Sequence, residues 1–169
     1  MKKNFAKVTH FAADWLLYAA GLGLVLMTII VGWQVFGRYV LNSSPSWSEQ
    51  AALTLMIWYV FLAAAAGVRE GFHIRIVALE NALGPKAKRV MRIVADLIIA
   101  GCGLALLVWG SELVMRTWEH VIPSLGLPRG IAYLALPLSG LLIMLFSLER
   151  LLEEAEGEAV SDEEDPRWS

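Results

Sequence analysis

Long stretches without charge constrain the fold of this chain more than any other feature. No charged residue occurs in Trp15–Gly37, Ala51–Val68 or Gly130–Leu148. As a helix rising 1.5 Å per residue, the first stretch would be about 34 Å long, against a bilayer hydrocarbon core of about 30 Å. A helix also satisfies its own backbone hydrogen bonds in lipid. Each stretch is therefore predicted to cross a membrane as one helix.

A fourth candidate span is shorter than the other three. Leu97–Ser111 is uncharged but is flanked by Asp96 and Glu112. It can cross a bilayer if the helix runs from about Arg92 to Arg116 and the charged side chains reach toward the membrane surfaces. A re-entrant or interfacial segment is the alternative.

Composition supports a membrane protein and argues against other classes. Of the 169 residues, 57% are hydrophobic and 18% are charged, whereas soluble domains have about 45–50% and about 25%. The net charge of −2 provides no basic face for nucleic acid. The single cysteine, Cys102, excludes an internal disulfide or a cysteine metal cluster. The predicted fold class is all-α integral membrane, with four transmembrane helices in residues 1–152 and an acidic, disordered tail in residues 153–169.

The distribution of Lys and Arg predicts the orientation. Only Arg38, Arg116 and Arg129, of the 14 Lys and Arg residues, fall on the side that holds the first and third connections. The other eleven lie near the two termini or around the second connection. Because positive residues favour the cytoplasmic side, both termini are predicted to be cytoplasmic. The first span is too long for the apolar region of a signal peptide and is expected to be retained.

Local signals predict where the helices begin, end and bend. Ser46 and Glu49 have the spacing of a capping box at the start of the second span, directly after Pro45. Pro128 suits the first turn of the fourth span. Pro137 should kink that span, because proline cannot donate to the carbonyl four residues earlier.

The connection between the second and third spans contains residues that end helices. Gly71 suits the C-terminal cap of the second span, and Gly84-Pro85 breaks the chain before the third. Apolar and polar residues alternate irregularly over residues 72–83. This pattern predicts either a short interfacial helix or an ordinary solvated loop.

No residue pattern in the chain predicts chemistry. The charged residues next to the spans fall near span ends, where we interpret them as membrane-surface anchors; they are Asp14, Arg38, Glu49, Arg69, Glu70, Asp96, Glu112 and Arg116. The histidines, His10, His73 and His120, lie outside the spans, which argues against a haem held by paired histidines. No carboxylate lies within the first span, as a small drug–proton exchanger would need. We therefore predict no catalytic residue, cofactor or metal.

Residue patterns that favour contact between helices are more frequent than patterns that suggest chemistry. Pairs of small residues four apart allow close helix approach; they are Ala19 and Gly23, Ala63 and Gly67, Gly101 and Ala105, and Ala135 and Ser139. Packing within the same four helices explains them as well as contact with a partner does. Trp58, Tyr59 and Trp109 lie nearer the span interiors and are candidates for contact with another protein or with lipid.

Two segments of the chain resemble a known family. They are Phe36-Gly37-Arg38-Tyr39-Val40-Leu41-Asn42 with Ser46-Trp47-Ser48-Glu49, and Trp58 with Ala66-Gly67-Val68-Arg69-Glu70-Gly71-Phe72-His73-Ile74. These residues resemble the small membrane subunit of tripartite ATP-independent periplasmic (TRAP) transporters, the DctQ-like family. Gln50 and Arg75-Ile76-Val77 depart from the family pattern.

The resemblance implies a non-catalytic small permease subunit of a sodium-coupled transporter for organic acids in the bacterial inner membrane. Its partners would be a large membrane subunit, for which it serves as a scaffold, a periplasmic substrate-binding protein, and phospholipid. The candidate contact residues for partner or lipid are Arg38, Tyr39, Trp47, Ser48, Glu49, Trp58, Arg69, Glu70 and His73. Arg38 and Glu49 can instead pair with each other, or act as anchor and cap. The alternative function is a self-assembling four-helix channel or carrier.

Overall fold

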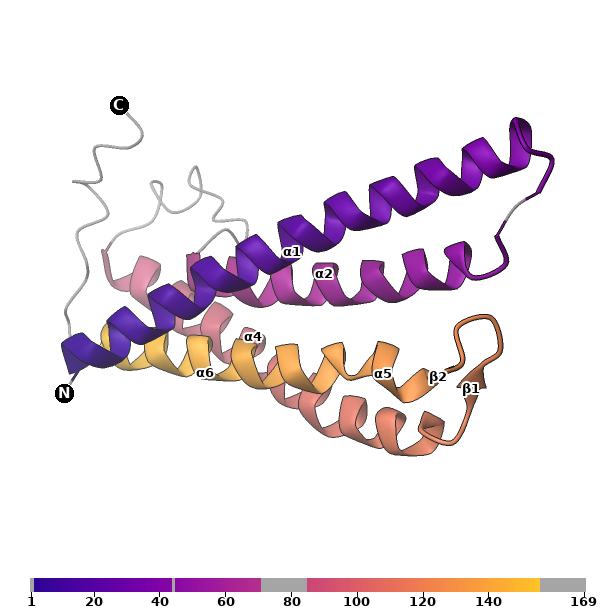
Figure 1. The fold of residues 1–169 in the computed structure, drawn as a ribbon. Helices are drawn as coiled ribbons and strands as arrows, with labels where there is room; N and C mark the ends of the chain where they lie inside the picture. The colour runs from indigo at the N-terminus through magenta and orange to yellow at the C-terminus, as the bar shows by residue number, and fades with distance from the viewer. Residues whose placement is uncertain (1, 44, 71–84, 156–169) are drawn as a thin grey trace, which may run out of the picture.

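The structure is a computed structural model that describes residues 2–43, 45–70 and 85–155 (Figure 1). Within these ranges, four segments are long and apolar enough to cross a membrane: Ala13–Tyr39, Ser48–Arg69, Val90–Thr117 and Arg129–Leu152. They belong to helices α1 (Lys2–Tyr39), α2 (Ser48–Glu70), α4 (Pro85–Thr117), α5 (Arg129–Tyr133) and α6 (Ala135–Ala155). The prediction of an all-α protein with four candidate spans is confirmed.

The third span is one continuous helix. Helix α4 begins at Pro85, where the fixed backbone of proline suits a first turn, and runs unbroken to Thr117. Its candidate span of 28 residues is about 42 Å long at 1.5 Å per residue. An unbroken helix of this length is long enough to pass through the whole hydrocarbon core, which favours a full span over the re-entrant alternative.

Some expected features fall on residues that the structure does not describe. The cap at Gly71, the interfacial segment over residues 72–83 and the break at Gly84 lie outside the described residues. So does the acidic tail from residue 156 onward, whereas residues 153–155 form the last turn of α6.

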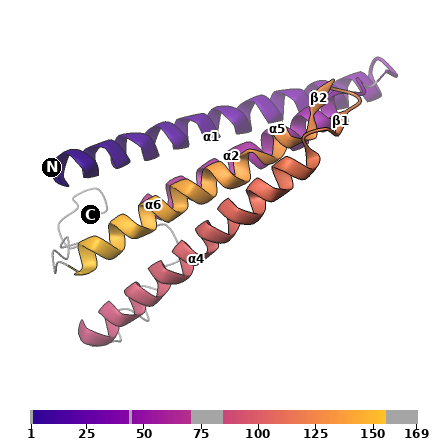
Figure 2. The ribbon, with the colours of Figure 1, turned by 90° about the horizontal axis from the view of Figure 1, so that it is seen from below.

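The long helices lie in an open row. Helix α2 packs against α1 on one side and α6 on the other, and α6 packs against α4. Figure 2 shows α1 and α4 at opposite edges of this row. In the 18-residue apolar window of each span, 6% of the residues are buried in α1, compared with 39% in the fourth span. The arrangement leaves most of the α1 surface available to lipid or to another protein.

Helices α1, α2, α4 and α6 all contribute residues to one apolar cluster. Its buried residues come from α2 and α6: Ala65, Val68, Ile143 and Phe146. Leu16 of α1, Ile99 and Leu106 of α4, and Leu142 of α6 pack against them.

Glycines bring α4 and α6 into close contact. A Cβ atom on Gly140 would lie 2.7 Å from the carbonyl oxygen of Gly103, and one on Gly110 would lie 3.0 Å from Pro137 Cδ. Gly101, the expected contact residue, is exposed and has no such neighbour within 4 Å. Packing within the chain therefore involves Gly103, on another face of α4, and does not explain Gly101, for which contact with a partner stays a prediction.

The helix of the fourth span is interrupted near Pro137, where the sequence predicted a kink. Helix α5 ends at Tyr133 and α6 begins at Ala135. Pro137 has no N–H to donate to the carbonyl of Tyr133. The helical hydrogen bonding resumes where the N–H of Leu138 donates to the carbonyl of Leu134 at 3.3 Å.

A small hairpin precedes α5 and was not predicted. Strands β1 (Val121–Ile122) and β2 (Leu127–Pro128) pair antiparallel. The turn uses Gly126, whose φ is +67° and whose N–H donates to the Ile122 carbonyl at 2.9 Å. Pro128 stands directly before α5, one position earlier than the first helical turn expected for it.

Candidate functional site

The turn between α1 and α2 explains part of the motif that carries the family resemblance. The N–H of Ser43 donates to the Gly37 carbonyl at 2.9 Å. A Cβ atom on Gly37 would lie 2.8 Å from the Ser43 carbonyl oxygen, so the close return of the chain requires glycine. Asn42 has a φ of +51°, a left-handed conformation that asparagine tolerates better than most residues.

Helix α2 starts differently from the prediction. It begins at Ser48, which is fully buried and donates its hydroxyl to the Pro45 carbonyl at 2.8 Å. The N–H of Ser48 lies 3.4 Å from the same carbonyl. Ser46 makes no hydrogen bond within the described part of the chain. The predicted cap at Ser46 is therefore wrong, and Ser48 takes a structural role at this position.

The other motif residues at this turn face outward. Tyr39 is 77% exposed and Trp47 is 42% exposed. Arg38 and Glu49 are also exposed, and no ion pair joins them in the ranges that the structure covers. The hypothesis of a pair across the hairpin is wrong here. Their side chains remain available to a partner or to the membrane surface.

At the other end of the row, charged side chains connect three helices. Arg150 of α6 has its Nε 3.4 Å from Asp96 Oδ1 of α4. Its Nη1 donates to the carbonyl of Val68 in α2 at 2.9 Å. Asp96 is only 2% exposed. A single guanidinium therefore joins α2, α4 and α6.

A second ion pair lies beside the first. Arg69 Nε is 3.5 Å from Glu149 Oε2, and Glu149 is 7% exposed. The hydroxyl of Ser147 donates to the backbone carbonyl of Asp96. We call these six residues the polar joint: Val68, Arg69, Asp96, Ser147, Glu149 and Arg150.

The polar joint corrects the interpretation of charged residues as membrane-surface anchors. Asp96 is buried between helices and does not reach toward a membrane surface. Arg69 pairs with a residue of its own chain, Glu149, which the sequence interpretation did not single out. A buried carboxylate in a span is tolerated when a cation pairs with it. The sequence did contain one indication of these ion pairs, because residues of opposite charge stand near the ends of different spans on the same predicted side of the membrane.

Trp58 makes an internal contact from the middle of α2. Its indole N–H donates to the carbonyl of Ile131 at 3.1 Å. Ile131 belongs to the five-residue helix α5, and the last carbonyls of so short a helix have no N–H partners within it. Trp58 thereby ties α2 to the interrupted fourth span. Glu70 ends α2, and its side chain and His73 lie outside what the structure describes.

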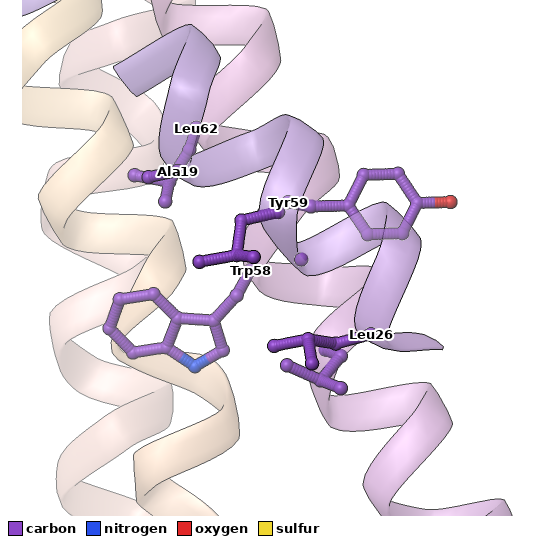
Figure 3. A pocket seen from close by; sticks show the side chains of 8 residues that line it. Ala19, Leu26, Trp58, Tyr59 and Leu62 are labelled. Carbon is purple, nitrogen blue, oxygen red and sulfur yellow. The ribbon is translucent and has the colours of Figure 1, made fainter. Parts of the chain in front are cut away.

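Beside Trp58, α1 and α2 enclose an apolar recess of about 280 Å³. Its lining comes equally from the two helices: Ala19, Leu22, Gly23 and Leu26 of α1, and Leu55, Trp58, Tyr59 and Leu62 of α2. Figure 3 shows the Trp58 ring at the recess and the Tyr59 hydroxyl directed away from it. A Cβ atom on Gly23 would lie 3.1 Å from Tyr59 Cβ, so Gly23 packs within the protein as its small size allows.

No described group of three or more His, Cys, Asp or Glu side chains is placed to hold a metal ion.

The fold and contact sites define a multi-pass membrane protein whose polar groups join helices and whose outer faces are largely apolar. Sequence comparison identifies the family within that class. The sequence profile of "Tripartite ATP-independent periplasmic transporters, DctQ component" matches residues 27–157. The chain belongs to this DctQ family of TRAP transporter small permease subunits.

Curated relatives agree with the family. A TRAP transporter small permease protein of Haemophilus influenzae is 31% identical over 130 residues, 76% of this chain and 80% of the relative. The ectoine TRAP transporter small permease protein of Halomonas elongata is 28% identical over 123 residues, 72% of this chain and 64% of the relative. The isethionate TRAP transporter permease protein DctMQ of Oleidesulfovibrio alaskensis is 26% identical over 145 residues, which are 80% of this chain but 22% of that protein.

Proposed function

We propose that this chain is the non-catalytic small permease subunit of a sodium-coupled TRAP transporter for organic acids. It serves as a scaffold for a large transport subunit in the bacterial inner membrane, with both termini cytoplasmic, and a periplasmic binding protein delivers the substrate. The match to DctMQ carries the proposal, because the part that resembles this chain makes up only 22% of that permease. In that relative, a DctQ-like segment is covalently joined to a much longer polypeptide.

The packing of the helices supports a scaffold role. Helices α4 and α6 cross closely at Gly103 and Gly140, and the polar joint ties both to α2. Such contacts stabilise one arrangement of the helices. At the same time, the open row leaves apolar faces on α1 and α4 for a membrane partner. A subunit with a rigid interior and uncovered outer faces suits the static part of a transporter.

Reconstitution tests the proposed function. The chain is purified alone and together with the large membrane subunit of its own system, and each preparation is placed in liposomes. We expect uptake of an organic acid only from the complex, in the presence of the binding protein and an inward sodium gradient. Uptake by this chain alone would contradict the proposal. Ion conductance by a homo-oligomer would favour the channel alternative.

A further inference from the structure

We propose that the polar joint binds the phosphate group of an anionic phospholipid, and that the terminal nitrogens of Arg69 hold the phosphate oxygens. The joint then connects α2, α4 and α6 to the lipid leaflet on their predicted cytoplasmic side. Only the choice of leaflet rests on the proposed function, because the contacts that favour an anion are the same in either orientation.

Arg69 is largely buried but is incompletely paired by its own chain. Its side chain is 15% exposed, and its buried Nε lies 3.5 Å from Glu149 Oε2 without a hydrogen bond. Its terminal nitrogens, Nη1 and Nη2, make no hydrogen bond or ion pair within the part of the chain that the structure describes. Burying a cation is costly unless acceptors surround it. Acceptors from outside the chain would therefore stabilise this guanidinium.

The two kinds of charge in the polar joint are buried to different degrees. The side chains of Asp96 and Glu149 are 2% and 7% exposed, whereas those of Arg69 and Arg150 are 15% and 16% exposed. Among the described residues, no contact uses Nη1 and Nη2 of Arg69 or Nη2 of Arg150, and these atoms are not buried. The joint contains as many carboxylates as guanidinium groups, yet its accessible atoms are N–H donors. An anion fits such a surface.

The position of Arg69 along α2 favours a phospholipid as the source of the anion. Arg69 is the last residue of the candidate span Ser48–Arg69, which places its guanidinium near the edge of the hydrocarbon core, beside the lipid headgroups. The faces of α2 that do not meet α1 or α6 are open to lipid, because the helices lie in a row. Phosphate is thus present around the chain at this depth, whereas another protein must carry a carboxylate there on a matching helix.

The chemistry of the headgroup also suits the site. Arginine can donate two parallel N–H groups to a phosphate, which fixes the headgroup in one orientation. Basic sites between transmembrane helices on the cytoplasmic side bind anionic headgroups. Eleven of the 14 Lys and Arg residues fall on this predicted side, so the surrounding potential favours anionic lipid over zwitterionic lipid.

The first test neutralises the ion pair that contains Arg69. The double variant Arg69→Gln/Glu149→Gln removes both charges together, so no buried charge is left without its counterion. The matched control is Arg116→Gln/Glu112→Gln, which makes the same exchange at an exposed ion pair near the end of α4. Wild type and both variants are purified at full length. Binding of dioleoylphosphatidylglycerol and of zwitterionic dioleoylphosphatidylcholine is titrated by native mass spectrometry.

We expect wild type to bind phosphatidylglycerol at least about 5-fold more tightly than phosphatidylcholine, the effect of about one cation near an anionic headgroup. The Arg69 double variant should lose this preference, and the control variant should keep it. No preference in wild type, or the same preference in all three chains, would overturn the proposal. Thermal unfolding in detergent checks that each variant remains folded.

A conservative variant tests the paired hydrogen bonds. Arg69→Lys keeps a cation beside Glu149 but replaces the planar guanidinium with a single ammonium. We expect this chain to stay folded and to bind phosphatidylglycerol more weakly than wild type, with part of the preference retained. If the double variant fails to fold, this variant decides the question, and binding equal to that of wild type would overturn the proposal.

Competition experiments identify the source of the anion. Excess inorganic phosphate should not displace phosphatidylglycerol, because it has no acyl chains to hold it at this depth; displacement would indicate a soluble anion instead. Release of the bound lipid when the large subunit joins the chain would assign Arg69 to that protein and would also overturn the proposal. The titrations use this chain alone. A failure of lipid selectivity therefore leaves the proposed function standing, and a failure of reconstituted transport leaves the lipid site standing.

Discussion

The guanidinium of Arg150 lies 3.4 Å from the carboxylate of Asp96 and also donates a hydrogen bond to the Val68 carbonyl. One cation therefore contacts the end of α2, the first turns of the α4 span and the last turns of α6. A pair in this setting stabilises the fold only while both charges are present, because removing one leaves the other buried and uncompensated.

Asp96→Ala is expected to destabilise the isolated chain by about 3 kcal/mol, because Arg150 keeps its charge and loses its counterion. Replacing both residues with leucine should recover a large part of this loss, since neither charge is then left buried. The measurement is unfolding in mixed detergent micelles. Glu112→Ala is the control, since the Arg116–Glu112 pair has 75% and 48% of its side chains exposed and should contribute less than about 1 kcal/mol. Equal effects of Asp96→Ala and Glu112→Ala would contradict the buried joint.

Gly140→Ala is expected to destabilise the chain by about 1–3 kcal/mol through overpacking. The added Cβ atom would lie 2.7 Å from the Gly103 carbonyl oxygen, so α6 must move away from α4. Gly101→Ala places the same atom where nothing lies within 4 Å. That variant should leave stability unchanged or raise it by up to about 1 kcal/mol, because alanine favours helix. The same unfolding assay compares the two variants. A larger loss of stability for Gly101→Ala than for Gly140→Ala would contradict the close contact between α4 and α6.

Trp58→Phe is expected to reduce stability by about 1 kcal/mol, because the half-buried Ile131 carbonyl loses its hydrogen-bond donor. Trp109→Phe is the matched control, since Trp109 is 68% exposed. Hydrogen exchange at the amides around the break between α5 and α6 gives a local measurement. Faster exchange there for Trp58→Phe, and not for Trp109→Phe, is the expected result. Unchanged exchange in both variants would show that the bond to Ile131 does not hold the interrupted span.

The predicted orientation is checked with reporter fusions. A fusion after Leu83 should report the cytoplasm and a fusion after Ser124 the periplasm, because eleven of the 14 Lys and Arg residues lie on the first of these sides. A cytoplasmic signal from the Ser124 fusion would reverse the assignment of sides. The structure places the start of α1 and the end of α6 at the same end of the row, as an even number of spans requires (Figure 1).

The spans and the break at Leu134 could be predicted because both depend on local sequence. Length without charge determines whether a segment crosses a bilayer, and Pro137 loses its hydrogen bond whatever surrounds it. The turn residues Gly37 and Asn42 were likewise visible as part of the family motif. Gly126 was the available sign of the hairpin, although strands of two residues each leave no alternating pattern to recognise.

The contacts between helices were harder to predict. A span surrounded by lipid is apolar on every face, so periodicity does not reveal which face of α4 meets α6, and the small-residue spacing pointed to Gly101 and Ala105 without indicating the contact of Gly103 with Gly140. The pairing of Asp96 with Arg150 likewise depends on which helices are neighbours. They are 54 positions apart in the chain, and no local rule joins residues so distant.

A row of helices, unlike a ring, does not close on itself. The surfaces that a ring would use up in joining its last member to its first remain uncovered along α1 and α4. Further helices can therefore be added at either flank without opening any existing contact. A membrane helix of another chain can thus pack on these edge faces while every contact within this chain is kept.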